Sequence, residues 1–366
     1  MNVTTKHGTL KTGKRLAALG VALLLAAGLT ACSGGANDGK AGPSASASES
    51  ASASASAPAP SASAGASATA PPAGSGPSDP EADAALLKAF EEQAHSDMSA
   101  AELSGVLDDK LKQAQPETGD ALVRTMLDYY DRSLPGIQAK FEPQNVQEAL
   151  RKLDWPPTDD GIGKIGDEQV RTLVQEAVSG GYKLETAEGM FFPVVDYGKL
   201  KRADAHVTAS MKDYIALLAV ESDQKSASDG GLVIERSEVA ARAAQAEAYV
   251  AKHPSSPERD RAEDLFATRY IPFLLMGLSN TPVFDYDTFK IDPEAKAAQQ
   301  RAIADHPGTV TARLTQEFLD LMNKTGGAVY KKGSGGEQID IPEVKSFYDG
   351  LENHARELLN EANPNK

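Results

Sequence analysis

A long tract without large apolar side chains confines the fold of this chain to residues 81–366. Residues 33 to 80 are almost entirely Ser, Ala, Gly and Pro, and Ser-Ala dipeptides repeat over residues 44 to 57. Such a segment cannot bury enough apolar surface to offset the conformational entropy of folding. We therefore expect a tether, which would span on the order of 40 Å as a flexible coil.

Apolar residues recur at spacings of three and four through most of residues 81–366. This spacing is typical of amphipathic α-helices that bury one face. We predict an all-α domain of nine to eleven helices. The stripes that support this prediction begin near Leu86, Leu103, Leu122, Val170, Val207, Val239, Leu265, Val310 and Val344.

Short sequence motifs indicate where individual helices begin, break and give way to strands. Ser99 and Glu102 form a capping-box pattern, which predicts the start of a helix. Pro272 lies within the stripe read from Leu265 to Leu278, so we expect it to kink or split that helix. Strand signals are few: residues 182–195 predict at most a small hairpin, and the Ser-, Asp- and Gly-rich stretch 222–231 would divide two lobes.

The N-terminus carries the pattern of an export signal. Four basic residues precede a charge-free apolar run, Leu16 to Leu29, which is shorter than the ~20 residues of a membrane span. The run ends in Leu29-Thr30-Ala31-Cys32, which resembles the lipobox of bacterial lipoproteins. The resemblance implies a signal peptide over residues 1–31, diacylglycerol on the thiol of Cys32, and a tether over residues 32–80. The membrane would then be a partner through this lipid, and the protein would sit on the extracytoplasmic face of the cell membrane.

Charge and cysteine content narrow the function classes. The formal net charge is −15, and removal of the signal's four positive charges leaves a mature chain of −19. Such an acidic chain is a poor partner for nucleic acid or for anionic lipid headgroups. Cys32 is the only cysteine, so we expect no intramolecular disulfide and no cysteine nucleophile.

Motifs of catalysis are not recognisable in this sequence. No H-E-x-x-H, G-x-S-x-G or Walker A pattern occurs in a suitable context. His354 and Glu357 would share a helix face, but such a pair is usually solvated rather than metal-bound. We therefore expect no metal site and no cofactor, and the catalytic residues of any enzyme activity stay unknown.

Two segments resemble each other. Residues 193–201 and 282–290 are identical at five of nine positions, and aromatic residues collect around both. Loops that carry aromatics and carboxylates are plausible recognition surfaces. The simpler alternative, which we favour, is that each aspartate caps a helix and each tyrosine fills the core. The candidate binding residues are Asp196, Tyr197, Asp285, Tyr286 and Asp287.

Three functional hypotheses follow. The first is a non-catalytic, lipid-anchored helical protein that binds an envelope protein or a wall or nutrient ligand. The second is a hydrolase of the cell envelope with paired carboxylates, which need only geometry and a shifted pKa. The third is a solute receptor of an importer, although the common two-lobed receptors contain parallel sheets that this sequence does not predict.

Overall fold

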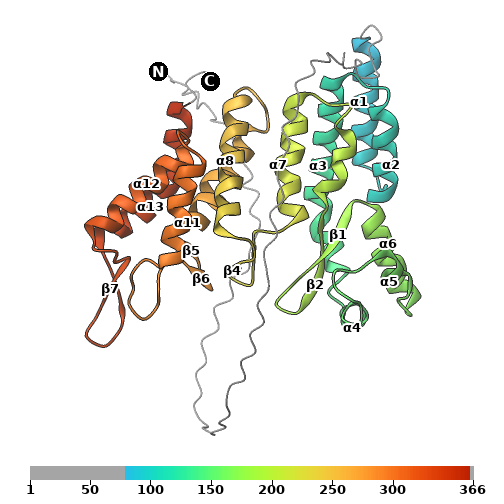
Figure 1. Cartoon of the computed structure of the whole chain (residues 1–366). Helices are drawn as coiled ribbons and strands as arrows, with labels where there is room; N and C mark the ends of the chain where they lie inside the picture. The colour runs from blue at the N-terminus through green and yellow to red at the C-terminus, as the bar shows by residue number, and fades with distance from the viewer. Residues whose placement is uncertain (1–78, 363–366) are drawn as a thin grey trace, which may run out of the picture. The chain divides into compact units, whose positions relative to one another are not determined.

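The computed structural model describes residues 79–362, which form a mostly α-helical domain (Figure 1). The predicted all-α class is confirmed: these residues contain thirteen α-helices and four two-stranded antiparallel sheets. The predicted signal peptide and Cys32 lie outside the described residues. The helix α1 begins at Pro80, the last residue of the predicted tether, and Asp79 caps it.

The elements follow one another along the chain without long unstructured connections. The helices are α1 (Pro80–Ala94), α2 (Ala100–Leu111), α3 (Pro116–Ala139), α4 (Gln144–Leu150), α5 (Asp159–Gly163), α6 (Glu168–Ser179), α7 (Ala209–Asp223), α8 (Arg236–Lys252), α9 (Arg259–Asp264), α10 (Ile271–Leu275), α11 (Pro293–Asp305), α12 (Val310–Lys324) and α13 (Pro342–Ala362). A 3₁₀ helix, η1 (Tyr197–Ala203), and a π-helical segment, η2 (Leu265–Tyr270), complete them. The strands are β1 (Tyr182–Ala187), β2 (Met190–Val195), β3 (Ala227–Ser228), β4 (Gly231–Leu232), β5 (Gly277–Leu278), β6 (Thr281–Pro282), β7 (Tyr330–Lys332) and β8 (Gln338–Asp340).

The number of helices exceeds the predicted nine to eleven for a physical reason. Helices α4 and α5 have seven and five residues, which is too short to display a repeating apolar stripe. The predicted capping box at Ser99 and Glu102 is present, and so is the hairpin in residues 182–195. The stretch 222–231 overlaps the hairpin β3–β4, which ends at Leu232.

The predicted interruption at Pro272 is also present. Helices α9 and α10 are joined directly by the π-helical segment η2, which ends two residues before this proline. A proline cannot donate a backbone hydrogen bond and crowds the carbonyl four residues earlier, so a wider turn relieves it. The predicted helix end at Leu278 is wrong: α10 ends at Leu275, because Gly277 has a φ of 74° and begins β5.

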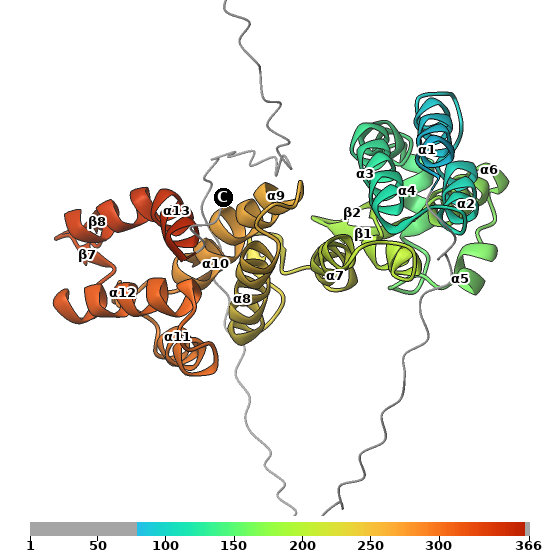
Figure 2. The same cartoon turned by 90° about the horizontal axis from the view of Figure 1, so that it is seen from above.

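One continuous apolar core runs through the helices. Helix α3 packs against both α1 and α2, whereas α11 packs on α12 and α12 on α13 (Figure 2). The buried aromatic rings are spread along this core rather than gathered at one point. The largest of them are Phe90, Tyr130, Phe141, Tyr182, Tyr214, Phe266, Tyr270 and Phe318.

Carboxylates from neighbouring helices close the N-terminal ends of two helices. Asp120 on α3 accepts hydrogen bonds from Thr208, the N-cap of α7, through the backbone N–H at 2.8 Å and the hydroxyl at 2.7 Å. Glu247 on α8 accepts from the backbone N–H groups of Val310 and Thr311, at 2.6 and 3.0 Å. These groups have no partner within their own helix, and a carboxylate also complements the positive end of the helix dipole.

Side-chain donors from other elements close the opposite, C-terminal ends of α6, α7 and α10. The last carbonyl groups of a helix lack intrahelical partners, so each unmet one would be costly when buried. The donor and acceptor pairs are Tyr130 with Gly180, Lys199 with Val178, Lys183 with Ser222, Arg242 with Gln224, Gln299 with Leu274, and Tyr348 with Leu275.

Helix α3 separates the two ends of the domain. Near its start, the backbone N–H of Gln115 donates to Asp83 in the first turns of α1. Near its end, the side chain of Gln138 donates to the carbonyl of Pro193 in β2, at 3.0 Å. A helix of 24 residues is about 36 Å long, so the chain enters the domain far from the hairpin β1–β2.

We expect Gly277→Ala to lower the free energy of unfolding by about 1–3 kcal/mol. The φ of 74° disfavours a side chain there, and an added Cβ would lie 2.5 Å from the carbonyl oxygen of Thr281. Urea unfolding followed by circular dichroism measures the change. Gly105→Ala is the matched control, because it lies within α2 with open space around it and should be neutral or stabilising by up to ~1 kcal/mol. Equal effects of the two substitutions would contradict this account.

Substitution of Glu247 by Ala should destabilise the domain by about 1–2 kcal/mol, because it leaves the first N–H groups of α12 without their acceptor. Gln245→Ala changes an exposed position of the same helix and should have a much smaller effect. Thermal unfolding of both variants tests the pair. A Glu247→Ala protein as stable as the control would show that water replaces the carboxylate.

Candidate functional site

Four β-hairpins lie at the end of the domain where α6, α7, α10 and α12 terminate (Figure 1). We call residues 182–195, 225–235, 276–292 and 328–341 the hairpin row. Each hairpin follows a helix, and each is bonded to the next, so the row is one connected surface.

The turns of the first two hairpins meet through the backbone of Glu188, whose N–H donates to Asp229 at 2.8 Å. Lys225 adds a second link by donating to the carbonyl of Thr186, at 2.8 Å. The second and third hairpins are joined in the same way. The backbone N–H groups of Asn280 and Leu232 donate to the carbonyl of Gly230 and the hydroxyl of Thr281, both at 2.8 Å.

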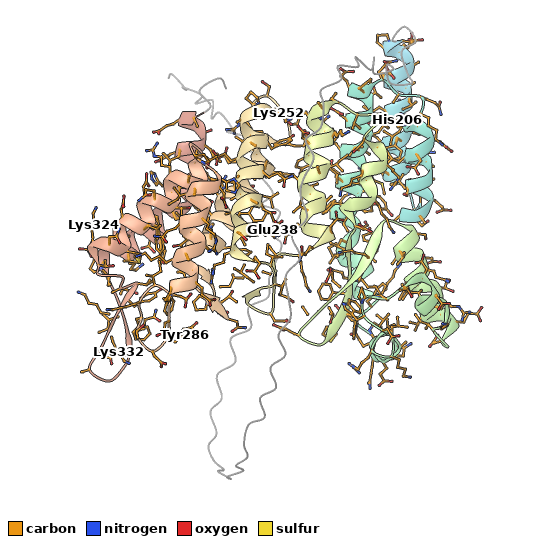
Figure 3. The ribbon with its side chains drawn as sticks, viewed as in Figure 1. His206, Glu238, Lys252, Tyr286, Lys324 and Lys332 are labelled. Carbon is orange, nitrogen blue, oxygen red and sulfur yellow. The ribbon has the colours of Figure 1, made fainter. Side chains whose placement is uncertain are left out.

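Aromatic rings join the third and fourth hairpins. The ring of Phe284 lies 5.0 Å from the rings of both Tyr286 and Tyr330, in edge-to-face geometry. Phe289 completes the cluster, at 6.3 Å from Phe284. Lys332 donates to the backbone carbonyl of Asp287 at 2.7 Å, which holds β7 against the connection between β6 and α11 (Figure 3).

The large apolar side chains that are exposed in the described residues lie in hairpins and connections, not along the helices. Five belong to the hairpin row, and Trp155 lies at its edge, with its ring 5.2 Å from the ring of Phe191 of β2 and tilted against it. Tyr286 is the most exposed, at 56%. A gathering of this kind at one end typically marks an interaction site. The six residues are Trp155, Met190, Val233, Met276, Tyr286 and Ile339.

Backbone strain occurs at the same place. Within residues 79–362, the non-glycine residues with positive φ are Glu188, Asp229 and Phe289, with φ of 51°, 50° and 54°. All three belong to the hairpin row. Glu188 and Asp229 each begin the two-residue loop of a hairpin, where a positive φ is an ordinary feature of the turn. A bulky residue such as Phe289 is rarely found in this conformation, and such residues persist where the surrounding structure holds them and often mark functional sites.

Five of these six apolar residues are not recognisable as site residues from the sequence, because an exposed methionine or isoleucine looks like a core residue there. The available signal was indirect. Gly-Gly pairs at 180–181, 230–231 and 326–327 and the Ser-Asn pair at 279–280 interrupt the helical stripes, and each pair precedes a hairpin of the row or lies in its turn.

The first of the two similar segments is packed into the domain. Asp196 precedes the 3₁₀ helix η1, its side chain makes no capping hydrogen bond there, and it lies 4.0 Å from Lys199. Tyr197 is half-buried and packs against the core. Burial raises the pKa of Tyr197 to about 12.

The second segment is exposed in the hairpin row. Asp285 accepts hydrogen bonds from the backbone N–H and the hydroxyl of Thr288, both at 2.8 Å, and so closes a tight turn. Tyr286 donates its hydroxyl proton to the carbonyl of Ser279 at 2.6 Å, which fixes the exposed ring (Figure 3). Asp287 is exposed beside it.

The structure does not bring the two segments together. Within the described residues, no hydrogen bond, ion pair or ring contact joins Asp196 or Tyr197 to Asp285, Tyr286 or Asp287. Their local sequences are alike, yet different neighbours bury one tyrosine and leave the other exposed.

Exposed carboxylates outnumber exposed ammonium groups in the hairpin row by seven to three. The surface is therefore apolar and acidic, which favours a partner of opposite charge. The acidic residues are Glu188, Asp229, Glu235, Asp285, Asp287, Glu337 and Asp340, and the basic ones are Lys290, Lys331 and Lys332.

The buried charges elsewhere in the domain are paired with each other. Arg124 on α3 binds Glu258 and lies 3.7 Å from Asp120, although burial raises the pKa of Asp120. Arg259 binds Glu263 at 2.7 Å. Such pairs hold helices together and leave no free carboxylate in this network.

Residues 79–362 contain no cluster of three His, Cys, Asp or Glu side chains arranged for a metal ion. The helices in this part of the chain lack the combination of length and apolar character that crossing a membrane requires. An open hollow of about 620 Å³ lies between the start of α12 and the end of α13, beside Val310, Arg313 and Leu358. It lies at the opposite end of α12 from the hairpin row.

Comparison with protein-family models, with curated proteins and with solved structures finds no match to this chain.

The stability of the turn that carries Tyr286 should depend on pH. Hydrogen bonds from the side chain and backbone of Thr288 lower the pKa of Asp285 below its usual value. The stabilisation is thus present above the pKa of an unfolded aspartate and is lost as the pH falls through the lower, folded value.

Carboxyl NMR titration should show that Thr288→Val raises the pKa of Asp285 part of the way back, because the backbone N–H still donates. Thr281→Val is the control, since that hydroxyl accepts from Leu232 and does not contact Asp285. An unchanged titration in Thr288→Val would contradict the assignment.

Proposed function

We propose that this chain is a lipid-anchored extracytoplasmic protein whose helical domain is a non-catalytic binding module, with the hairpin row as its recognition surface. The observation that supports the binding role is that two unusual features occur together at one end of the domain. The exposed large apolar side chains and the positive-φ residues gather there, away from the paired charges of the helices.

The anchoring part of the proposal is supported by the lipobox-like pattern that ends in Cys32 and by the Ser/Ala-rich tether after it. Two or more acyl chains hold a protein stably at a bilayer. The domain begins at α1, about 36 Å of helix away from β1–β2, the first hairpin of the row. A surface on the far side of the domain from its attachment is accessible to partners in the envelope.

Substitution Cys32→Ala should abolish lipid labelling and release the protein from the membrane fraction. We expect the loss to be nearly complete, because the thiol is the only site for the first lipid. Fractionation after growth with a labelled fatty acid measures both effects. The neighbouring Ser33→Ala is the control and should remain labelled and sedimenting. A Cys32→Ala protein that still carries label would end the anchoring proposal.

A further inference from the structure

We infer that the hairpin row is a docking surface for a second protein, one that presents an apolar and basic face. This inference rests on the proposed binding role and adds the class of partner.

The apolar residues of the row have the character of protein-interface anchors. Trp, Tyr and Met are enriched in the cores of such interfaces. The row exposes Tyr286 and two methionines, and Trp155 is exposed at its edge. Tyr286 is already ordered, because Phe284 supports its ring and Ser279 holds its hydroxyl. A ring that is fixed before binding loses little side-chain entropy on docking, which favours it as an energetic centre.

Charge selects the partner. The row exposes seven carboxylates and three ammonium groups, and the whole chain has a net charge of −15. Glu188 lies two residues from the exposed Met190, and Asp285 and Asp287 flank Tyr286. Apolar anchors with acidic neighbours complement a face on which basic side chains surround apolar pockets.

The same charges oppose other occupants. An anionic bilayer would repel the acidic rim, whereas surfaces that insert into membranes usually combine apolar with basic residues. A second copy of the chain would place two acidic rows against each other. The hollow beside Arg313 lies at the other end of α12, so a small solute bound there would leave the row free.

Site-specific photo-crosslinking in intact cells tests the surface. A photoreactive amino acid replaces Tyr286, Met190 or Ile339 in the full-length protein, and Glu117 or Lys112 serves as the control. Both controls are exposed near the start of α3, at the other end of the domain. We expect the row positions to give one common protein adduct of basic character, and the controls not to give it. Lipid adducts, adducts to a second copy, equal labelling from the controls or no adduct from any row position would each overturn the inference.

Binding of the captured protein, once purified, then tests the energetics. The variant Tyr286→Ala, and separately Met190→Ser, should weaken binding by about tenfold or more, whereas Glu117→Gln should not. Combined Glu188→Gln, Glu235→Gln, Asp287→Asn and Asp340→Asn should weaken binding and reduce its salt dependence. Circular dichroism checks that each variant is folded. Unchanged affinity in all of them would exclude the row as the docking surface.

Trp155 provides an independent readout, because it is the only tryptophan and lies at the edge of the row. Its emission should shift to the blue when the partner docks and stay unchanged with phosphatidylcholine or phosphatidylglycerol vesicles. A shift with vesicles alone would replace the protein partner by a membrane. The binding and fluorescence measurements use purified full-length protein and need no membrane. Failed anchoring in Cys32→Ala and failed docking are therefore distinguishable results.

Discussion

Unmet backbone groups at helix ends are the constraint on which this domain depends. At one end, Asp120 and Glu247 on neighbouring helices accept hydrogen bonds from the free N–H groups at the starts of α7 and α12. At the other end, donors such as Tyr130 and Gln299 reach the last carbonyl groups of α6 and α10. Because neighbours satisfy these groups, the chain can leave each helix abruptly and form a hairpin.

The candidate site is a product of that arrangement. Each hairpin is too small to be stable alone, since isolated two-stranded hairpins are marginal in water. The hairpins are held by the helices that precede them and by hydrogen bonds to one another, such as those from Glu188 and Asn280. The helices therefore provide stability, and the hairpins are free to carry residues that do not stabilise the fold. The exposed Tyr286 is an example.

Much of the fold was predictable because the buried face of a helix leaves apolar residues at spacings of three and four in the sequence. The stripe from Met211 through Tyr214 and Ile215 is buried along α7, and the alternation in residues 182–195 gives β1–β2. The short helices α4 and α5 and the two-residue strands were not predictable, since they are too brief to repeat a pattern.

The candidate site was predictable only in part, for a different reason. Residues 193–201 and 282–290 share five of nine positions, so local sequence cannot tell which copy is exposed. Tyr197 is half-buried against the apolar core, whereas Tyr286 is exposed. Met190 and Ile339 have side chains that are equally common in a core, and only the complete fold shows that they are 44% and 43% exposed. Exposure is a tertiary property that no short window contains.

The π-helical segment η2 lets the continuous helical segment α9–η2–α10 contact both α13 and α7. An extra residue in a helical turn rotates everything after it by about 100° around the axis. Before the segment, Arg259 and Glu263 face α13, where they meet Asn360 and Arg356. At its end, the hydroxyl of Tyr270 donates to Glu221 on α7, at 3.2 Å. This rotation allows one helical axis to contact both α13 and α7, without a loop between the two points of contact.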